Sequence, residues 1–212
     1  MSNTIIQGDC LEVMKGFKDN EFDLVITDPP YGIGIAKAGK VGGGSVRGKT
    51  KKFKPSSWDE FTPSQAYFDE IRRVSTNQII FGGNYFANKL SNSRCWLVWF
   101  KRDGLPTRTF ADAELAWTSF DSNTRVFSLR WDGFIRDSKN DRFNHPTQKP
   151  TELLKWCIAQ FKLEGQTILD PFMGTGSTLI AAQEMGCDCT GIEINQEYID
   201  IASNRTKQGV LL

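Results

Sequence analysis

One short segment, Asp28-Pro29-Pro30-Tyr31, combines a carboxylate, two prolines and an aromatic ring. Neither proline has a backbone N–H, and each pushes the residue before it toward an extended conformation. The segment therefore offers acceptors, namely the Asp28 carboxylate and the carbonyls of Asp28 and Pro29, with the ring of Tyr31 beside them. We predict a site for a flat substrate that carries an exocyclic amino group. A proline turn in which Asp28 caps a helix explains these four residues alone equally well.

Three more acidic residues stand, like Asp28, at the end of an apolar run that predicts a buried strand. They are Asp9, Asp170 and Glu193. In open α/β sheets, ligands bind at the carboxyl ends of the strands. We therefore expect four carboxylates at one edge of the sheet, which is more than the packing of a core requires. Asp9 alone would be explained as a helix cap. It is a candidate site residue because the other three acids are expected at the same edge.

A glycine-containing turn, 170–178, joins a predicted strand to a predicted helix. Gly174 and Gly176 let the backbone approach a ligand closely. Glu193 then stands near the position at which dinucleotide-binding folds place the acid that holds ribose hydroxyls. Leu179 occupies the place of the third glycine of that pattern, so the turn predicts a nucleoside site rather than a pyrophosphate cradle. The alternative is a plain strand–helix turn with an exposed Glu193.

Strands and helices alternate along most of the chain, which predicts an open α/β sheet with helices on both faces. Strands are predicted at 4–7, 22–28, 78–81, 96–100, 114–118, 167–169 and 189–194, with 126–131 as a further candidate. Helices are predicted at 10–17, from Pro63 to 74, at 85–90, from Pro150 to near Gly165, at 177–185 and at 196–208.

Composition places the chain among ordinary globular proteins, with 39% hydrophobic and 24% charged residues in 212. No apolar run reaches the length of a membrane span, and the first residues show no signal-peptide pattern. Five scattered cysteines and a single histidine, His145, argue against a disulfide framework and against a metal site. We expect one domain in the cytoplasm, with no metal and no membrane partner.

Three motifs resemble those of the S-adenosylmethionine-dependent DNA amino-methyltransferases, which methylate adenine at its 6-amino group or cytosine at its 4-amino group. The motifs are 28–31, 145–150 (His-Pro-Thr-Gln-Lys-Pro) and 170–178. Their order, with the catalytic motif before the glycine turn, is similar to that of the circularly permuted β group. The resemblance implies one Rossmann-like methyltransferase domain over residues 1–212. Its fold would be a seven-stranded, mostly parallel sheet with helices on both faces.

The resemblance also implies roles for individual residues. Those that would bind the cofactor S-adenosylmethionine are Asp9, Asp170, Phe172, Gly174, Gly176, Ser177, Glu193, Thr147 and Lys149. Glu193 would hold the ribose hydroxyls and Asp9 the adenine amino group, while Asp170 would lie near the cofactor's own amino group. Thr147 and Lys149 would lie near the methionine carboxylate, at a helix N-terminus that favours an anion. The catalytic residues would be Asp28, Pro29, Pro30 and Tyr31.

The chemistry of an aromatic amine explains this catalytic set. The amine is a poor nucleophile, and two acceptors, the Asp28 carboxylate and the Pro29 carbonyl, would favour a pyramidal nitrogen facing the methyl group. The target base must be flipped out of the duplex and would stack on Tyr31. Asp before the prolines favours adenine, with cytosine-N4 as the alternative. No Pro-Cys pair occurs, which argues against ring-carbon methylation, and His145 is interpreted as structural.

Residues 32–57 show no periodicity and predict a long mobile loop. Seven basic residues and no acidic one lie between 35 and 55, although the net charge of the chain is only +1. They are Lys37, Lys40, Arg47, Lys49, Lys51, Lys52 and Lys54. We predict that this loop closes on double-stranded DNA through its phosphates, and a solvated loop is the alternative.

Other functions fit parts of the sequence less well. Gly43 to Thr50 fits a phosphate-loop pattern, but no strand precedes it and no good helix follows, which argues against a nucleotide triphosphatase. A non-catalytic nucleoside-binding module would not need an intact 28–31 segment. An RNA or protein amino-methyltransferase is a nearer alternative. The chain has little room for a target-recognition insert, so we place target recognition at 32–57 or at 125–145. We therefore expect a short target sequence or additional DNA contacts from a homodimer partner. The enzyme would work in a restriction-modification system or alone.

Overall fold

The protein is described by a computed structural model that covers residues 2–34, 40–41, 51–52, 60–102, 111–132, 135–136, 148–161 and 166–208. Its main element is an eight-stranded sheet. The strands are β1 (Asn3–Gln7), β2 (Phe22–Thr27), β5 (Ser75–Phe81), β6 (Trp96–Phe100), β7 (Ala113–Thr118), β8 (Arg125–Ser128), β11 (Thr167–Asp170) and β12 (Asp188–Glu193). Across the sheet their order is β1-β12-β11-β2-β5-β7-β6-β8.

The sheet is mostly parallel. Strands β1, β12, β11, β2 and β5 run parallel to one another. Strand β7 is antiparallel to both β5 and β6, and β8 returns to a parallel pairing with β6. The parallel half therefore brings the carboxyl ends of five strands to one edge, as the predicted α/β sheet requires.

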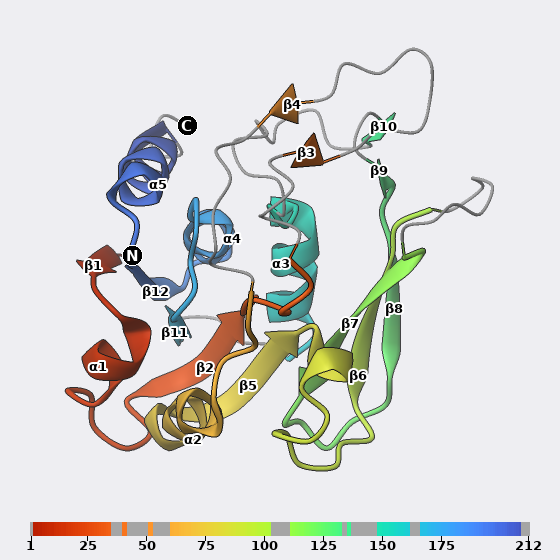
Figure 1. Ribbon diagram of the computed structural model, residues 1–212, viewed down its shortest axis with the longest axis horizontal. Helices are drawn as coiled ribbons and strands as arrows, with labels where there is room; N and C mark the ends of the chain where they lie inside the picture. The colour runs from red at the N-terminus through yellow and green to blue at the C-terminus, as the bar shows by residue number, and fades with distance from the viewer. Residues whose placement is uncertain are drawn as a thin grey trace.

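Helices cover both faces of the sheet, as predicted (Figure 1). Helices α3 (Thr151–Ala159), α4 (Ser177–Glu184) and α5 (Gln196–Gln208) lie on one face, and α1 (Cys10–Met14) and α2 (Gln65–Val74) lie on the other. The strands are buried on both sides, so alternate residues enter different cores. Leu24 and Ile26 of β2 pack with α3 and α4, whereas Val25 packs with α1 and α2.

The strand count differs from the implied seven because the 126–131 candidate is a strand, β8. Its side chains are mostly exposed, as expected of an edge strand, so its apolar pattern is weak. Within 32–57, where a loop without structure was predicted, β3 (Lys40–Val41) and β4 (Lys51–Lys52) form a short antiparallel pair. A second such pair joins β9 (Trp131–Asp132) and β10 (Ile135–Arg136).

Helices α2 and α3 begin slightly later than predicted, whereas α1, α4 and α5 begin at the predicted residues. Pro63 and Pro150 precede α2 and α3 instead of opening them, with Ser64 and Pro150 at the N-cap positions. The predicted helix at 85–90 is a single 3-10 turn, Gly83–Tyr85. In the part of the chain that the structure describes, no helix has both the length and the apolar character needed to cross a membrane.

Candidate active site

The four predicted acids lie at the same edge of the sheet. Asp9 follows β1, Asp28 follows β2, and Asp170 and Glu193 end β11 and β12. Two cavities of about 320 Å³ each open there, and both are lined by Pro30, Phe172, Glu193 and Ile194. This is the size range of small-molecule sites. The shared residues make the two cavities neighbours, so a single elongated ligand could occupy both.

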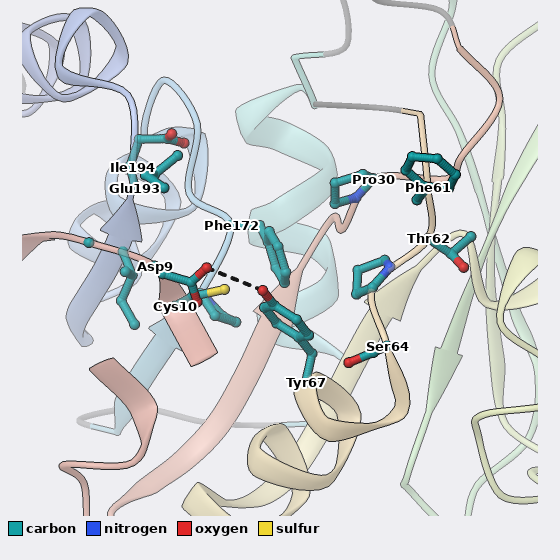
Figure 2. A pocket seen from close by; sticks show the side chains of 14 residues that line it. Asp9, Cys10, Pro30, Phe61, Thr62, Ser64, Tyr67, Phe172, Glu193 and Ile194 are labelled. Atoms are coloured by element: carbon teal, nitrogen blue, oxygen red, sulfur yellow. Dashed lines mark hydrogen bonds between the residues drawn. The ribbon is translucent and has the colours of Figure 1, made fainter. Parts of the chain in front are cut away.

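The first cavity lies between β1 and α2 (Figure 2). Asp9 caps α1, since one carboxylate oxygen accepts the Leu11 N–H at 2.8 Å, so the capping role is real. Its second oxygen accepts the Tyr67 hydroxyl at 3.2 Å and faces the cavity. The rings of Tyr67 and Phe172 lie 6.0 Å apart and enclose the space beside Asp9. The arrangement suits a flat ring with a hydrogen-bond donor at its edge.

Glu193 stands between the two cavities. One of its carboxylate oxygens accepts the Gly174 N–H at 3.1 Å and the other accepts the Asn195 N–H at 2.8 Å. Burial raises the pKa of Glu193, while these backbone N–H groups lower it. A carboxylate has about four acceptor positions, so some acceptor capacity remains beside the hydrogen bonds from the backbone. The side chain is thus held rigidly with acceptors available to a ligand.

The glycine turn follows β11, and its two glycines have different roles. Gly174 has φ +52°, donates to Glu193 and has open space where a side chain would stand. Gly176 has φ +78°, but a β-carbon there would lie 2.8 Å from the β-carbon of Ala202 in α5. Gly174 therefore opens the second cavity, whereas Gly176 lets α5 pack closely and is not among the residues that line either cavity.

Asp170 is buried beneath this turn and also lines the second cavity. It accepts the Thr178 hydroxyl at 2.6 Å, the Thr27 hydroxyl at 3.0 Å and the Phe172 N–H at 3.1 Å. Burial raises the pKa of Asp170 to about 6, against the lowering effect of these hydrogen bonds. Ser177, at the start of α4, lines the same cavity.

The segment predicted to be catalytic, 28–31, faces the second cavity with Asp28 and Pro30. The Tyr31 hydroxyl donates to Asp28 Oδ1 at 2.5 Å, and the Lys149 ammonium donates to Asp28 Oδ2. Burial raises the pKa of Asp28, and the neighbouring Lys149 charge acts against that rise. Pro29 is buried and Pro30 reaches both cavities. The acceptor-rich stub predicted from the sequence is present.

The ring of Tyr31 is packed on neighbouring residues. Gly82, with φ +72°, leaves the room for it, since a β-carbon there would lie 2.2 Å from the Tyr31 ring. Tyr85 stacks on the same ring at 4.8 Å with 14° between the planes, and Tyr85 is 42% exposed. A second aromatic residue therefore accompanies Tyr31 at this edge of the sheet.

Lys149 lines the second cavity, and the cofactor-binding role that the resemblance implies for it stays a prediction. It is 8% exposed, and besides Asp28 it pairs with Glu114 of β7 at 3.1 Å. Glu114 in turn pairs with Lys101 at 2.8 Å. Burial alone would raise the pKa of Glu114, but the two lysines lower it to about 2. Lys149 thus belongs to a buried charge network around the Asp28 carboxylate.

Several predicted residues fall outside the described part of the chain. These are Thr147, His145, Lys37, Arg47, Lys49 and Lys54, and with them the phosphate-loop pattern at 43–50. Lys40, Lys51 and Lys52 lie on the short strands β3 and β4.

Three residues of the site were not predicted from the sequence: Tyr67, Tyr85 and Glu114. Each stands in an element that carries no recognised motif, on α2, on the 3-10 turn and on β7. A polar residue inside an apolar strand, Glu114 in Ala113–Thr118, was the available signal for the last one.

Known proteins with similar sequence and structure point the same way. The type II methyltransferase M.HinfI of Haemophilus influenzae is 27% identical over an alignment that spans 252 residues and covers 97% of this chain and 68% of that protein. The structure of TTHA0409 from Thermus thermophilus, complexed with S-adenosyl-L-methionine, superposes with a TM-score of 0.61 at 19% identity, covering 100% of this chain and 97% of that one. PvuII DNA methyltransferase, which is cytosine-N4-specific, superposes with a TM-score of 0.64 at 15% identity, covering 97% and 86%.

The two structural similarities establish the Rossmann-like methyltransferase fold expected from the resemblance. The DNA methylase family N6_N4_Mtase matches residues 87–204, which is more than half of the chain. This match includes the glycine turn, Glu193 and most of α5. The protein therefore belongs to the N6_N4_Mtase family of DNA methylases, the enzymes that methylate exocyclic amino groups of DNA bases.

Proposed function

We propose that this DNA methylase transfers a methyl group from S-adenosylmethionine to the 6-amino group of a flipped-out adenine in double-stranded DNA. One observation carries the proposal: Asp28 and the glycine turn face the same cavity. An acceptor for an amino group thus stands beside a site built for a nucleoside. The aspartate, rather than a serine, before the two prolines favours adenine over cytosine.

The cofactor fits the two neighbouring cavities by its chemistry. Its adenine would lie beside Asp9 and against the rings of Tyr67 and Phe172, with the carboxylate oxygen of Asp9 accepting from the amino group. Glu193 stands between the cavities and would accept both ribose hydroxyls. The amino acid end of the cofactor would lie in the second cavity, with Asp170 close to the cationic amino group and the first turn of α4 beyond it.

The chain's own residues act on the target amino group. S-adenosylmethionine supplies, when bound, a methyl group on a positively charged sulfur. Asp28 and the Pro29 carbonyl would accept the two amino hydrogens, which keeps the nitrogen lone pair out of the ring and free to bond to the methyl carbon while the carbon–sulfur bond breaks and leaves its electron pair on sulfur. After transfer the nitrogen carries a positive charge, and the Asp28 carboxylate receives its extra proton. No covalent link between enzyme and base is needed.

The flipped base needs an apolar surface to offset the loss of stacking in the duplex. Tyr31 and Tyr85 would provide one, because their rings already stack on each other next to Asp28 and Tyr85 is partly exposed. We assign to this pair the stacking role that the sequence alone placed on Tyr31.

Contacts to the rest of the DNA belong to segments beyond the site. The basic residues between 35 and 55 follow the catalytic segment directly and would bind phosphates, and 125–145 would contribute to target recognition. We propose that residues 1–212 act as one domain in the cytoplasm, within a restriction-modification system, with a homodimer partner supplying further DNA contacts.

The affinity for S-adenosylmethionine should rise with pH between about 5 and 7. Asp170 has a raised pKa of about 6, so it is neutral below that pH and carries a negative charge above it. The cationic amino group of the cofactor is attracted only to the ionised form. Calorimetric titration at each pH would measure the dissociation constant, and Asp170→Asn should flatten its pH dependence. A wild-type constant that does not change over this range would contradict the role of Asp170.

The base that is methylated can be read directly from DNA. Sequencing of modified bases in DNA from a methylation-free host that expresses the chain should show N6-methyladenine in one short sequence context. The same experiment with the Asp28→Ala variant should show unmodified DNA. Detection of N4-methylcytosine instead would transfer the proposal to cytosine and leave the assignment of the site intact.

A further inference from the structure

The Lys149 ammonium lies against residues that are predicted to be catalytic. It contacts Asp28 Oδ2, and it lies 3.4 Å from the Tyr31 hydroxyl, and 5.6 Å and 5.3 Å from the ring centroids of Tyr31 and Phe81. The Lys149 ammonium, like the target amino group, is a nitrogen with several N–H donors. It lies between the carboxylate and the ring that the proposed function assigns to the target amino group. Both oxygens of Asp28 thus already hold donors from the chain itself.

A carboxylate oxygen can accept a second hydrogen bond, but the target amino group comes closest to Asp28 when one of these donors gives way. Lys149 is the one with a second anionic partner, since Glu114 Oε2 lies 3.1 Å from its ammonium. A buried ammonium that left Asp28 without such a partner would be strongly disfavoured. Glu114 is itself held by Lys101 at 2.8 Å, so the two carboxylates and two ammonium groups stay balanced in charge after the shift.

We propose that Lys149 is a positioning residue that orients the ionised Asp28 in the free enzyme and withdraws onto Glu114 when the target amino group enters. The inference rests on the proposed role of Asp28 as the acceptor of that group. It assigns to Glu114 and Lys101, which lie outside the recognised motifs, the task of receiving the displaced ammonium.

The same arrangement controls the ionisation of Asp28. Burial raises the pKa of this carboxyl, and among the charged and titratable groups facing it Lys149 lowers it while Glu114 raises it. Tyr31 lowers it by its hydrogen bond, and the neighbouring Asp170 adds like charge. Loss of Lys149 therefore leaves a carboxyl that protonates more readily, and a protonated Asp28 is a poorer acceptor for an amine.

The test is the pH profile of methyl transfer from labelled S-adenosylmethionine to unmethylated plasmid DNA. For Lys149→Met, the acidic limb of the profile should move to higher pH by about one unit or more, because an opposite charge at this distance has been removed. The rate at neutral pH should fall about a hundredfold, since Asp28 also loses its orientation. Lys149→Arg keeps the cation and should restore the acidic limb. Lys155→Met, in α3 but paired with Glu184 on the surface, should leave the profile unchanged.

Glu114→Gln gives the opposite sign and an independent test. Removing this like charge should move the acidic limb to lower pH, while the rate still falls because Lys149 has no anion to withdraw to. Affinity for S-adenosylmethionine should be unchanged in both variants. If Lys149 instead binds the cofactor carboxylate, Lys149→Met weakens that affinity and leaves the acidic limb in place, which overturns the proposal.

The outcomes also separate this inference from the function on which it rests. Activity that survives in Asp28→Ala would overturn both. An inactive Asp28→Ala together with a wild-type profile in Lys149→Met would overturn the role of Lys149 alone. Should Lys149→Met fail to fold, Glu114→Gln decides the question, because an unchanged rate in that variant contradicts the withdrawal of Lys149.

Discussion

Replacing Asp28 by alanine should reduce methyl transfer to DNA by about a thousandfold, or about 4 kcal/mol in the barrier, while the affinity for S-adenosylmethionine stays unchanged. The reason is that this carboxylate acts on the target amine, whereas the described contacts expected to hold the cofactor come from Asp9, Asp170 and Glu193. Single-turnover transfer of a labelled methyl group would measure the rate, and calorimetry would measure cofactor binding.

Asp28→Asn is the matched control for this experiment. It keeps the size of the side chain and one acceptor oxygen but removes the charge that pairs with Lys149. We expect a folded protein with an intermediate rate. If Asp28→Ala keeps more than about a tenth of the wild-type rate, the catalytic assignment of this residue fails, because that loss is smaller than one electrostatic contact in a transition state provides.

Replacing Glu193 by alanine should raise the dissociation constant for S-adenosylmethionine by about a hundredfold. Two hydrogen bonds to a charged acceptor are worth about 1.5 kcal/mol each at the lower end, and about 3 kcal/mol corresponds to this factor. The loss also frees the Gly174 and Asn195 N–H groups, which Glu193 holds at 3.1 and 2.8 Å. Calorimetric titration of the purified variant would give the constant.

Two comparisons sharpen the result. Glu184→Ala removes an exposed carboxylate of α4 that pairs with Lys155, and should leave cofactor binding unchanged. A cofactor analogue without ribose hydroxyls should bind the wild type about as weakly as Glu193→Ala binds S-adenosylmethionine, and should bind both proteins alike. An analogue that still distinguishes the two proteins would show that Glu193 contacts a different part of the ligand.

Much of the sheet was predictable because its strands are buried on both faces. Such strands contain short continuous apolar runs, and those of β2 and β11 stand out from the polar turns around them. Strand β8 was only a candidate, since three of its four residues are exposed and its pattern lacks a clear period. The strand count was therefore uncertain at the edge of the sheet and firm in its centre.

Some residues of the site were likewise predictable from the sequence, and others were not. Asp9, Asp28, Asp170 and Glu193 were predictable because a side chain at the end of a parallel strand lies at the ligand-binding edge whatever the rest of the fold does. Gly176 was predicted to bind the cofactor, and this role stays a prediction. Its missing β-carbon also lets α5 approach at Ala202, a contact that the sequence did not predict.

The sequence by itself determined the α/β sheet, the edge that carries the acids, and the family to which Asp28-Pro29-Pro30-Tyr31 and the glycine turn belong. These follow from local order, because strand ends and turns are set by neighbouring residues. Only the tertiary structure decided that Tyr67 faces Asp9, that Tyr85 stacks on Tyr31, and that Lys149 lies on Asp28. Each of these pairs joins separate elements of the chain, and their meeting depends on how α2, the 3-10 turn and the segment leading into α3 pack against the sheet.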